Sequence, residues 1–385
     1  MSLPVSEPIP PSSSPSQPAA GPPAPQSASI DSGPKTDASP FFFVCCQEGA
    51  EQAVKEALCG PEKPFRMAFS RPGFLTMKSE FSVPVWSPAV PENQFVRCSG
   101  HALGSVQGES ADLLIDEILG KYASIGWENL HIWQRDIAVP GWNNFEPGRS
   151  ALAKLVADQF SQRLQATSDA RFGRINQIAN WNERVLDIVL IEPNYWWVGT
   201  HVADKIHRRW PGGVFMIDPP EDMISRAYLK IAEAMAWSQL PFQRGDAIVE
   251  IGSSPGGACQ YMLDQGYKVT GVDPAEMAPS VAAHPAFEHI RARSLQVKRK
   301  VFSKFRWLVC DANVAPNYTL DTVEGIVTYP STAIEGLLLT IKLSEWSKAA
   351  EVNSHLERVA SWGYTHTMAR QLSYNRREYC IAAWK

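Results

Sequence analysis

The chain has 385 residues, of which 44% are hydrophobic and 20% charged, and its formal net charge at pH 7 is −4. This length accommodates two or three globular domains, each with its own core. No apolar run reaches the ~18–20 residues needed to span a bilayer, so no membrane association is predicted. The slightly acidic balance excludes a uniformly basic protein, so nucleic acid could be bound only through local basic patches.

The first 39 residues differ in composition from the rest of the chain. They are rich in Pro, Ser and Ala and hold almost no large apolar side chains. They therefore cannot bury enough surface to offset the entropy cost of ordering. Residues 1–39 are predicted to form a disordered tail. The same stretch has no basic segment followed by an apolar run, so a secretion signal is not expected.

Two small α+β units are predicted between this tail and residue 205. The first, residues 40–94, combines strand-like runs with one amphipathic helix, at Phe41–Cys46, Glu51–Leu58, Phe74–Met77 and Phe81–Trp86. The second, residues 95–205, combines two helices with two strands, at Ala111–Tyr122, His131–Gln134, Ser150–Gln165 and Val185–Ile191. Prolines and glycines in the stretch 201–220 then indicate a linker with turns.

Strands and helices alternate over residues 222–385. The predicted strands are Ala247–Ile251, Lys268–Val272, Phe287–Ile290, Trp307–Cys310, Leu337–Lys342, Thr365–Leu372 and Tyr379–Trp384. Helical patterns separate most of them, notably at Ser225–Trp237 and Ser344–Trp362. This alternation predicts an α/β fold with a doubly wound, mainly parallel seven-stranded sheet. A short connection between the last two strands favours an antiparallel hairpin at one edge, a shape typical of Rossmann-like methyltransferases rather than dehydrogenases.

A glycine-rich turn follows the first of these strands. The segment Ala247–Gly257 reads strand, loop and helix start, with the spacing Gly252-x-x-x-Gly256-Gly257. In this context the loop backbone can approach a bound nucleotide closely, although a purely structural turn is the alternative. The spacing is neither Gly-x-Gly-x-x-Gly nor a phosphate-binding loop ending in Gly-Lys-Ser/Thr. Because the loop has no lysine, it suits a ligand without a polyphosphate, and S-adenosylmethionine is the candidate.

Charged residues stand at the carboxyl ends of several predicted strands, where ligands of doubly wound sheets bind. Asp273 ends the second strand, about 20 residues after the glycine loop, where an acid can bind ribose hydroxyls or cap a helix. Asp311 and Lys342 end two strands that would lie side by side. Lys230 and Glu378 could complete a cluster with them, although exposed strand ends are commonly charged.

Seven cysteines occur without any C-x-x-C pair, and most lie in apolar, strand-like runs. Buried reduced thiols are expected, which favours the cytoplasm and argues against a structural metal site. Two basic clusters are candidates for RNA contact or for solvated surface. One is the run Arg291–Arg306, which holds seven lysines and arginines and no acid; the other is Lys205, His207, Arg208 and Arg209.

Five segments, in this order, resemble the FtsJ-like RNA ribose 2′-O-methyltransferases: Ser225–Lys230, Glu250–Gly257, Val309–Asp311, Leu339–Lys342 and Ala369–Glu378. The closing segment and the preceding α+β region are similar to one subgroup, the bacterial enzymes that methylate a cytidine of 23S rRNA. The resemblance implies a ferredoxin-like unit over 40–94, a THUMP-like RNA-binding domain over 95–205 and the methyltransferase domain over 222–385. It also implies S-adenosyl-L-methionine as methyl donor and 23S rRNA, or a large-subunit precursor, as partner.

The resemblance further assigns roles to individual residues. It implies a catalytic tetrad of Lys230, Asp311, Lys342 and Glu378. It implies a cofactor site lined by Ser225, Gly252, Ser254, Pro255, Gly256, Gly257, Asp273 and Asp311. The chain departs from the family where an acid usually contacts the adenine, and Ser294 stands near that place. Lys342 is expected to be the general base, provided that burial lowers its pKa more than the neighbouring carboxylates raise it.

Two other functions are open to this sequence. A small-molecule O-methyltransferase is disfavoured by the long N-terminal region and by a lysine where metal-ligating acids or a histidine are expected. A non-catalytic RNA-binding protein with a relic methyltransferase fold is disfavoured by the intact Lys–Asp–Lys–Glu set. The missing adenine acid weighs slightly for the relic.

Overall fold

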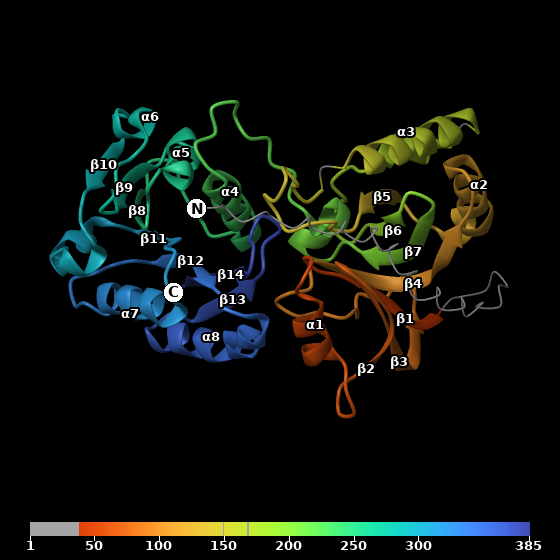
Figure 1. Ribbon diagram of the computed structural model, residues 1–385, viewed down its shortest axis with the longest axis horizontal. Coiled ribbons are helices and arrows are strands. Elements are labelled where there is room, and N and C mark those ends of the chain that lie inside the picture. The colour runs from red at the N-terminus through yellow and green to blue at the C-terminus, as the bar shows by residue number, and fades with distance from the viewer. Residues whose placement is uncertain (1–37, 149, 168) are drawn as a thin grey trace, which may run out of the picture. The chain divides into compact units, whose positions relative to one another are not determined.

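The computed structural model describes residues 38–148, 150–167 and 169–385, which form two seven-stranded sheets (Figure 1). Most of the predicted tail, residues 1–37, lies outside the described residues. Within the described part of the chain, no helix is both long enough and apolar enough to cross a membrane.

The first sheet has the strand order β2-β3-β1-β4-β7-β6-β5. Its strands are β1 (Ala38–Cys45), β2 (Phe65–Arg71), β3 (Phe74–Pro84), β4 (Cys98–Gln107), β5 (Asn129–Gln134), β6 (Arg184–Glu192) and β7 (Tyr195–Val202). The helices of this half are α1 (Glu51–Leu58), α2 (Ala111–Tyr122) and α3 (Ala151–Ala166). Ser110 and Ser150 cap α2 and α3 by accepting a hydrogen bond from a backbone N–H three residues on.

One continuous sheet joins the two α+β units expected from the sequence. Strand β1 pairs with β3 on one side and with β4 on the other, so the expected boundary near residue 94 falls between strands of one sheet. The division into a ferredoxin-like and a THUMP-like domain stays a prediction. Strands β2, β4 and β7 were absent from the predicted elements, and the expected Phe74–Met77 and Phe81–Trp86 belong to the single strand β3.

The second sheet has the strand order β10-β9-β8-β11-β12-β14-β13. Its strands are β8 (Ala247–Ile251), β9 (Lys268–Val272), β10 (Phe287–Ile290), β11 (Trp307–Cys310), β12 (Gly336–Lys342), β13 (His366–Arg370) and β14 (Glu378–Trp384). The first five are mutually parallel, whereas β14 lies antiparallel between β12 and β13. The predicted doubly wound sheet with an antiparallel edge hairpin is therefore confirmed.

Helices cover both faces of this second sheet (Figure 1). Apolar side chains of α4 (Ala227–Ser238), α5 (Gly257–Asp264) and α6 (Pro279–Ala282) pack on one face. Those of α7 (Pro316–Val327) and α8 (Val352–Ser361) pack on the other. The predicted helix 344–362 is α8 preceded by a 3-10 turn. This 3-10 turn is Trp346–Glu351. The other 3-10 turns lie at Ala123–Ile125, Ala170–Arg174, Ile206–Arg209, Pro211–Gly213, Ser294–Gln296 and Arg299–Lys304.

The core beneath α7 and α8 extends into the N-terminal half. The same hydrophobic cluster contains Val54 and Leu58 of α1 and Phe95, together with Leu320 of α7 and Ile341 of β12. Helix α1 therefore packs against the C-terminal half through apolar contacts. This packing brings the loop between β1 and α1 to the carboxyl end of the second sheet, where its side chains contact the segment before β14.

Candidate active site

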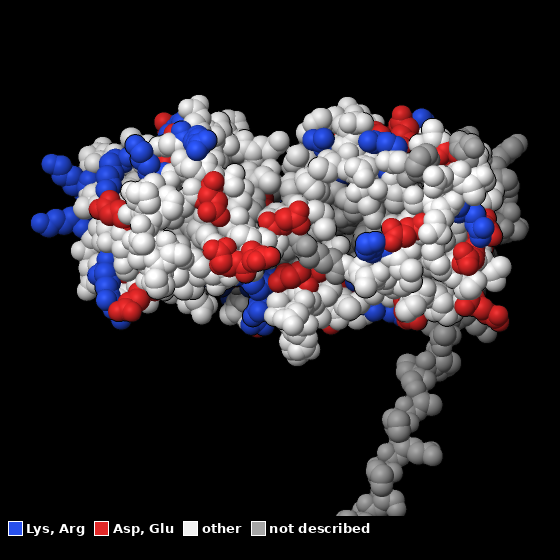
Figure 2. Space-filling view, turned by 90° about the horizontal axis from the view of Figure 1, so that it is seen from above, with Lys and Arg blue, Asp and Glu red and all other residues white. Residues whose placement is uncertain are grey.

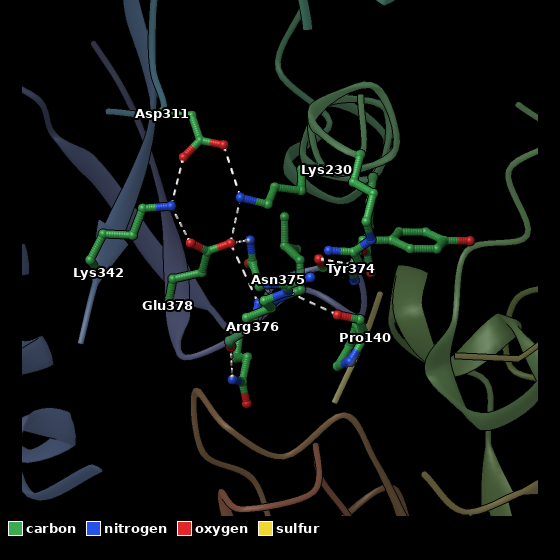
Figure 3. Close-up of polar contacts among 12 residues, drawn as sticks. Pro140, Lys230, Asp311, Lys342, Tyr374, Asn375, Arg376 and Glu378 are labelled. Atoms are coloured by element: carbon green, nitrogen blue, oxygen red, sulfur yellow. Dashed lines mark hydrogen bonds and ion pairs between the residues drawn. The ribbon is translucent and has the colours of Figure 1, made fainter. Parts of the chain in front are cut away.

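Two carboxylates and two ammonium groups form a closed ring at the carboxyl end of the second sheet (Figure 3). Lys230 projects from α4, Asp311 follows β11, Lys342 ends β12 and Glu378 begins β14. Strands β11 and β12 are parallel neighbours, so Asp311 and Lys342 lie together as expected. The antiparallel register of β12 and β14 places Glu378 directly opposite Lys342.

Each lysine of the ring bridges both carboxylates. Lys230 Nζ lies 3.0 Å from Asp311 Oδ2 and 2.6 Å from Glu378 Oε1. Lys342 Nζ lies 3.0 Å from Asp311 Oδ1 and also contacts Glu378 Oε2. The side chain of Glu378 is only 5% exposed, whereas that of Lys342 is 23% exposed. The ring is therefore neutral overall, and Lys342 is its most exposed member.

Burial and charge act in opposite directions on the pKa values of the ring. Burial disfavours charge on Lys342, but Asp311 and Glu378 outweigh it and raise the pKa of the ammonium above its usual value. Burial also disfavours charge on Glu378, yet Lys230 and Lys342 lower the pKa of this carboxyl to about 2. The condition set for Lys342 as general base, that burial lowers its pKa more than the carboxylates raise it, is therefore not met, because the carboxylates favour its protonated form.

The predicted glycine loop joins β8 to α5, and its glycines are required by close contacts. Gly252 has φ +81°, and a Cβ there would lie 2.9 Å from the Cα of Ala312. Gly256 has φ +116°, and a Cβ would lie 3.0 Å from the methyl group of Met277. The loop is tied to the next strand because Ser254 donates its backbone N–H to Asp273 Oδ2 at 3.2 Å.

A pocket of about 440 Å³ opens beside this loop and holds most of the predicted cofactor residues. Its lining includes Gly252, Ser254, Asp273, Ser294 and Asp311. The other predicted residues do not line it: Pro255, Gly256 and Gly257 form the turn into α5, and Ser225 lines a second pocket. Another part of the lining was not predicted from the sequence. It is formed by Asn313, Val314, Tyr318, Thr319 and Thr322.

This pocket has polar groups that suit a nucleoside. Thr319 Oγ1 is buried without a hydrogen-bond partner among the described residues, and its residue lines the pocket. Asp273 accepts backbone hydrogen bonds on both carboxylate oxygens, at 3.2 Å from Ser254 and 2.8 Å from Ala275, so its orientation is fixed. A held carboxylate and an unsatisfied hydroxyl can bind ribose hydroxyls and ring nitrogens.

A second pocket, of about 800 Å³, lies over the exposed side of the ring. Lys230, Lys342 and Glu378 line it, whereas Asp311 lines the first pocket. Asn313 lines both, so the ring stands where the two pockets adjoin. Asn313 lies two residues after Asp311 in the same loop, so its place at the site could have been predicted from the sequence.

A buried acid behind the ring was also missed by the sequence reasoning. Glu250, in β8, is 2% exposed and accepts a hydrogen bond from the Cys259 thiol at 2.8 Å. Burial raises the pKa of this carboxyl to about 8. The sequence pattern that could have predicted this residue is an acid inside an otherwise apolar strand, just before the glycine loop.

The basic cluster before residue 210 does not form a free cationic surface. Arg208 is 2% exposed and bridges Glu92 and Asp204. Arg209 donates to the carbonyl of Ala179 at 2.6 Å and lies over the ring of Trp181. The expectation that Arg208 contacts phosphates is therefore wrong, because its charge is buried and paired.

The later basic run is exposed in part. In Figure 2, Lys and Arg side chains gather at the left edge, on the side where β10 lies in Figure 1. Arg291 and Lys304 pair with Glu276 and Glu288. The exposed residues Arg293, Lys298 and Lys300 form no ion pair among the described residues.

One buried group in the N-terminal sheet combines residue types that can bind metals, namely Cys98, Asp187 and His201. Both ring nitrogens of His201 are engaged, Nδ1 with Asp187 at 2.5 Å and Nε2 with the carbonyl of Arg208 at 2.7 Å. Both nitrogens are occupied by these contacts, so neither is free to bind a metal.

Comparisons with known proteins agree with this geometry. Residues 223–343 match the FtsJ-like methyltransferase family. Ribosomal RNA large subunit methyltransferase M of Alkalilimnicola ehrlichii is 27% identical over 186 residues, covering 46% of this chain and 50% of that protein. The protein of the same name from Azotobacter vinelandii is 30% identical over 185 residues, covering 44% and 50%.

The chain thus spans about half the length of the curated relatives it matches. Among solved structures, Aeropyrum pernix fibrillarin in complex with S-adenosyl-L-methionine aligns with TM-score 0.32 and 17% identity, over 51% of this chain and 81% of that one. The family match ends at residue 343, so it includes three members of the ring and leaves out Glu378. Over residues 223–343, this chain is therefore similar to the FtsJ-like methyltransferase family.

Proposed function

We propose that this protein transfers a methyl group from S-adenosyl-L-methionine to a ribose 2′-hydroxyl of RNA, with large-subunit rRNA as the substrate. The observation that carries the proposal is the closed Lys–Asp–Lys–Glu ring at the junction of two pockets. The family match over 223–343 and the names of the relatives support the reaction and the substrate class.

The pocket beside the glycine loop is the proposed cofactor site. Asp273 would hold the ribose of the adenosyl group, and Ser294 and Thr319 would lie beside its adenine. S-adenosyl-L-methionine, when bound, supplies a methyl group activated by its positively charged sulfur. The chain's own contribution is to hold the acceptor oxygen in line with that methyl group, and positioning of this kind can contribute roughly 7–11 kcal/mol.

The ring is proposed to act on the acceptor hydroxyl. As an ammonium group, Lys230 donates a hydrogen bond that orients the oxygen and stabilises negative charge developing on it. Asp311 and Glu378 hold both lysines in place through the four contacts of the ring. We assign Lys342 as the proton acceptor, acting in the minority of molecules in which its amine is neutral, because its ammonium is favoured at rest.

The exposed cations at Arg293, Lys298 and Lys300 are the proposed contacts of the catalytic half with the RNA backbone. Arg208 is not proposed to contact the RNA, because its charge is buried and paired. A cytoplasmic location, expected from the reduced cysteines, stays a prediction.

Two measurements test the proposed function. Calorimetric titration with S-adenosyl-L-methionine should release or absorb heat with one site per chain, whereas a relic fold would give none. Large-subunit rRNA from a strain lacking the protein should then gain a mapped 2′-O-methyl group when incubated with protein and cofactor. Cofactor binding without any rRNA methylation would leave the small-molecule O-methyltransferase as the remaining candidate.

A further inference from the structure

The pocket over the ring is built by both halves of the chain. Its catalytic wall includes Arg376 and Arg377, which directly precede Glu378. Its opposite wall is the loop between β1 and α1, residues Gln47, Glu48 and Gly49. A pocket of about 800 Å³ is within the size range that encloses a small organic ligand. A ligand that reaches the ring through this pocket passes between these two walls.

The two arginines at this pocket have guanidinium groups that are held but not neutralised. Arg376 Nε donates to the carbonyl of Pro140 at 3.0 Å, and Arg377 Nε donates to the carbonyl of Leu343 at 2.9 Å. Both side chains are exposed, and neither forms an ion pair within the described part of the chain. A planar guanidinium fixed by carbonyls keeps free N–H donors that match a phosphate group.

The N-terminal wall is fixed in place at both ends of its short loop. Gln47 is 4% exposed; it donates to the carbonyl of Asn375 at 2.6 Å and accepts from Gln371 Nε2 at 2.8 Å. Gly49 packs beneath Trp346 so closely that a Cβ would lie 3.2 Å from the indole nitrogen. The loop therefore has a defined position relative to the ring.

Between Gln47 and Gly49 lies a carboxylate, that of Glu48. Glu48 is partly exposed and makes no hydrogen bond or ion pair with another residue that the structure describes. Both neighbouring residues of the loop are held, yet its charge is left open toward a pocket that also holds two unpaired arginines. A carboxylate only accepts hydrogen bonds, and the exocyclic amino group of a nucleobase is a donor that it recognises.

We propose that this pocket receives a single nucleotide turned out of an RNA strand. Arg376 and Arg377 bind its flanking phosphates, and Glu48 accepts a hydrogen bond from the amino group of its base. The inference rests on the proposed function, because the ribose of that nucleotide must meet the ring. The ribose has to reach the ring inside a pocket of about 800 Å³, which a base-paired duplex cannot enter, so the nucleotide has to leave its stack. Uracil, which has no amino group, is excluded as the preferred base.

The phosphate contacts are tested with Arg376→Ala and Arg377→Ala, and with Arg66→Ala as matched control on exposed strand β2. The KM for rRNA should rise, and the dependence of RNA affinity on salt should weaken by about one ion for each phosphate that is no longer bound. The Kd for S-adenosyl-L-methionine should stay unchanged, which shows that the variants are folded. Unchanged KM and salt dependence in both variants, with the wild type active, would overturn the phosphate contacts.

The base contact is tested with Glu48→Ala, with Glu56→Ala on the exposed side of α1 as control. The substrates are rRNA transcripts in which the mapped target base is replaced by each other base. Wild-type protein should prefer an amino-bearing base over uracil by about 10- to 100-fold in kcat/KM, and Glu48→Ala should lose that preference. Glu48→Gln, which keeps an acceptor of the same size, should retain part of it.

Two results overturn the base contact. One is a uridine target in the wild type, and the other is an unchanged preference in Glu48→Ala. A wild-type protein that methylates no rRNA is a different outcome, because it removes the proposed function and the pocket's assignment together.

Discussion

Burial and two neighbouring carboxylates have opposite effects on the pKa of Lys342. Its position at the end of β12 buries it partly, but two carboxylates lie within ion-pair distance and stabilise its charge. The assignment of this lysine as proton acceptor therefore depends on a small neutral population, which grows about tenfold with each unit that the pH rises toward the pKa.

This population predicts the pH dependence of the reaction. Because the pKa of Lys342 is raised, log kcat/KM should increase with slope near one from pH 7 to pH 9 without a plateau. Lys342→Ala should lower kcat by about 10²- to 10⁴-fold at any of these pH values. Initial rates of rRNA methylation measure both effects. A flat profile in the wild type would instead assign Lys342 an orienting role as an ammonium.

Glu378 makes the ring sensitive to acid. Its pKa in the folded protein is about 2, below the usual 4.5, so its charge stabilises the fold at neutral pH. That contribution is complete above pH ~4.5 and is lost progressively as the pH falls toward 2. Between pH 5.5 and 3.5, the melting temperature of Glu378→Gln should therefore fall less than that of the wild type. Glu56→Gln, an exposed control, should follow the wild type, and equal slopes for all three proteins would contradict the low pKa.

At the scale of elements, the segment between β13 and β14 is held by both halves of the chain. Gln47 binds the carbonyl of Asn375, whose side chain in turn donates to Glu378 Oε1 at 3.2 Å. Glu233 of α4 accepts the backbone N–H groups of Ser373 and Tyr374, at 2.9 and 3.0 Å. The position of Glu378 thus depends on contacts from the loop between β1 and α1 as well as from α4.

Gln47→Ala should consequently reduce turnover more than cofactor affinity. The change removes two buried hydrogen bonds, which lowers the free energy of unfolding by about 1–3 kcal/mol. It also loosens the segment that orients Glu378, so kcat should fall while the Kd for S-adenosyl-L-methionine stays constant. The control is Gln52→Ala, whose side chain is exposed on α1. Equal losses of kcat in Gln47→Ala and Gln52→Ala would argue that Gln47 does not orient Glu378.

The second sheet could be predicted strand by strand, whereas part of the N-terminal sheet could not. Strands such as Leu337–Lys342 are continuous apolar runs bounded by turn residues, a strong pattern for a buried parallel strand. Strand β4 carries Gly100 and β7 carries Gly199, which weaken the strand pattern. The structure explains both glycines, because a Cβ at either position would lie 2.5 Å from the ring of Phe43.

Prediction of the site had a similar limit. Asp311 and Lys342 could be paired from adjacent strands, and Lys230 and Glu378 were candidates to complete their cluster. The family resemblance then assigned all four to a catalytic tetrad. The walls contributed by Gln47 and Glu48 could not be predicted, because they depend on how α1 packs against the catalytic half. Arg208 was assigned to the surface because a run of basic residues has no sequence signal for Glu92, its distant partner.

At the scale of the whole molecule, one hydrophobic cluster includes residues from both sheets. Val54 and Leu58 of α1 belong to the same core as Leu320 and Val359 of the catalytic half. An interface with a shared apolar core couples the stability of its two sides, unlike the polar contacts typical of mobile domains.

Unfolding should accordingly be a single cooperative event. Calorimetry on the intact chain should give one transition, and a fragment comprising residues 222–385 should melt at a lower temperature because it exposes the surface that α1 covers. Circular dichroism at rising temperature can compare the two. Two separate transitions in the intact chain, with the later one matching the fragment, would argue that the halves unfold independently.

The register of β12 and β14 has a consequence for the variation that this protein can tolerate. Lys342 and Glu378 face each other because β14 enters the sheet at one fixed residue. Inserting or deleting one residue in β14 would turn every following side chain to the opposite face of the sheet. Substitutions in the preceding loop can be absorbed if its length stays the same. Functional relatives should therefore vary in the composition of this loop but hardly in its length, and a natural insertion there would mark a protein that has lost the reaction.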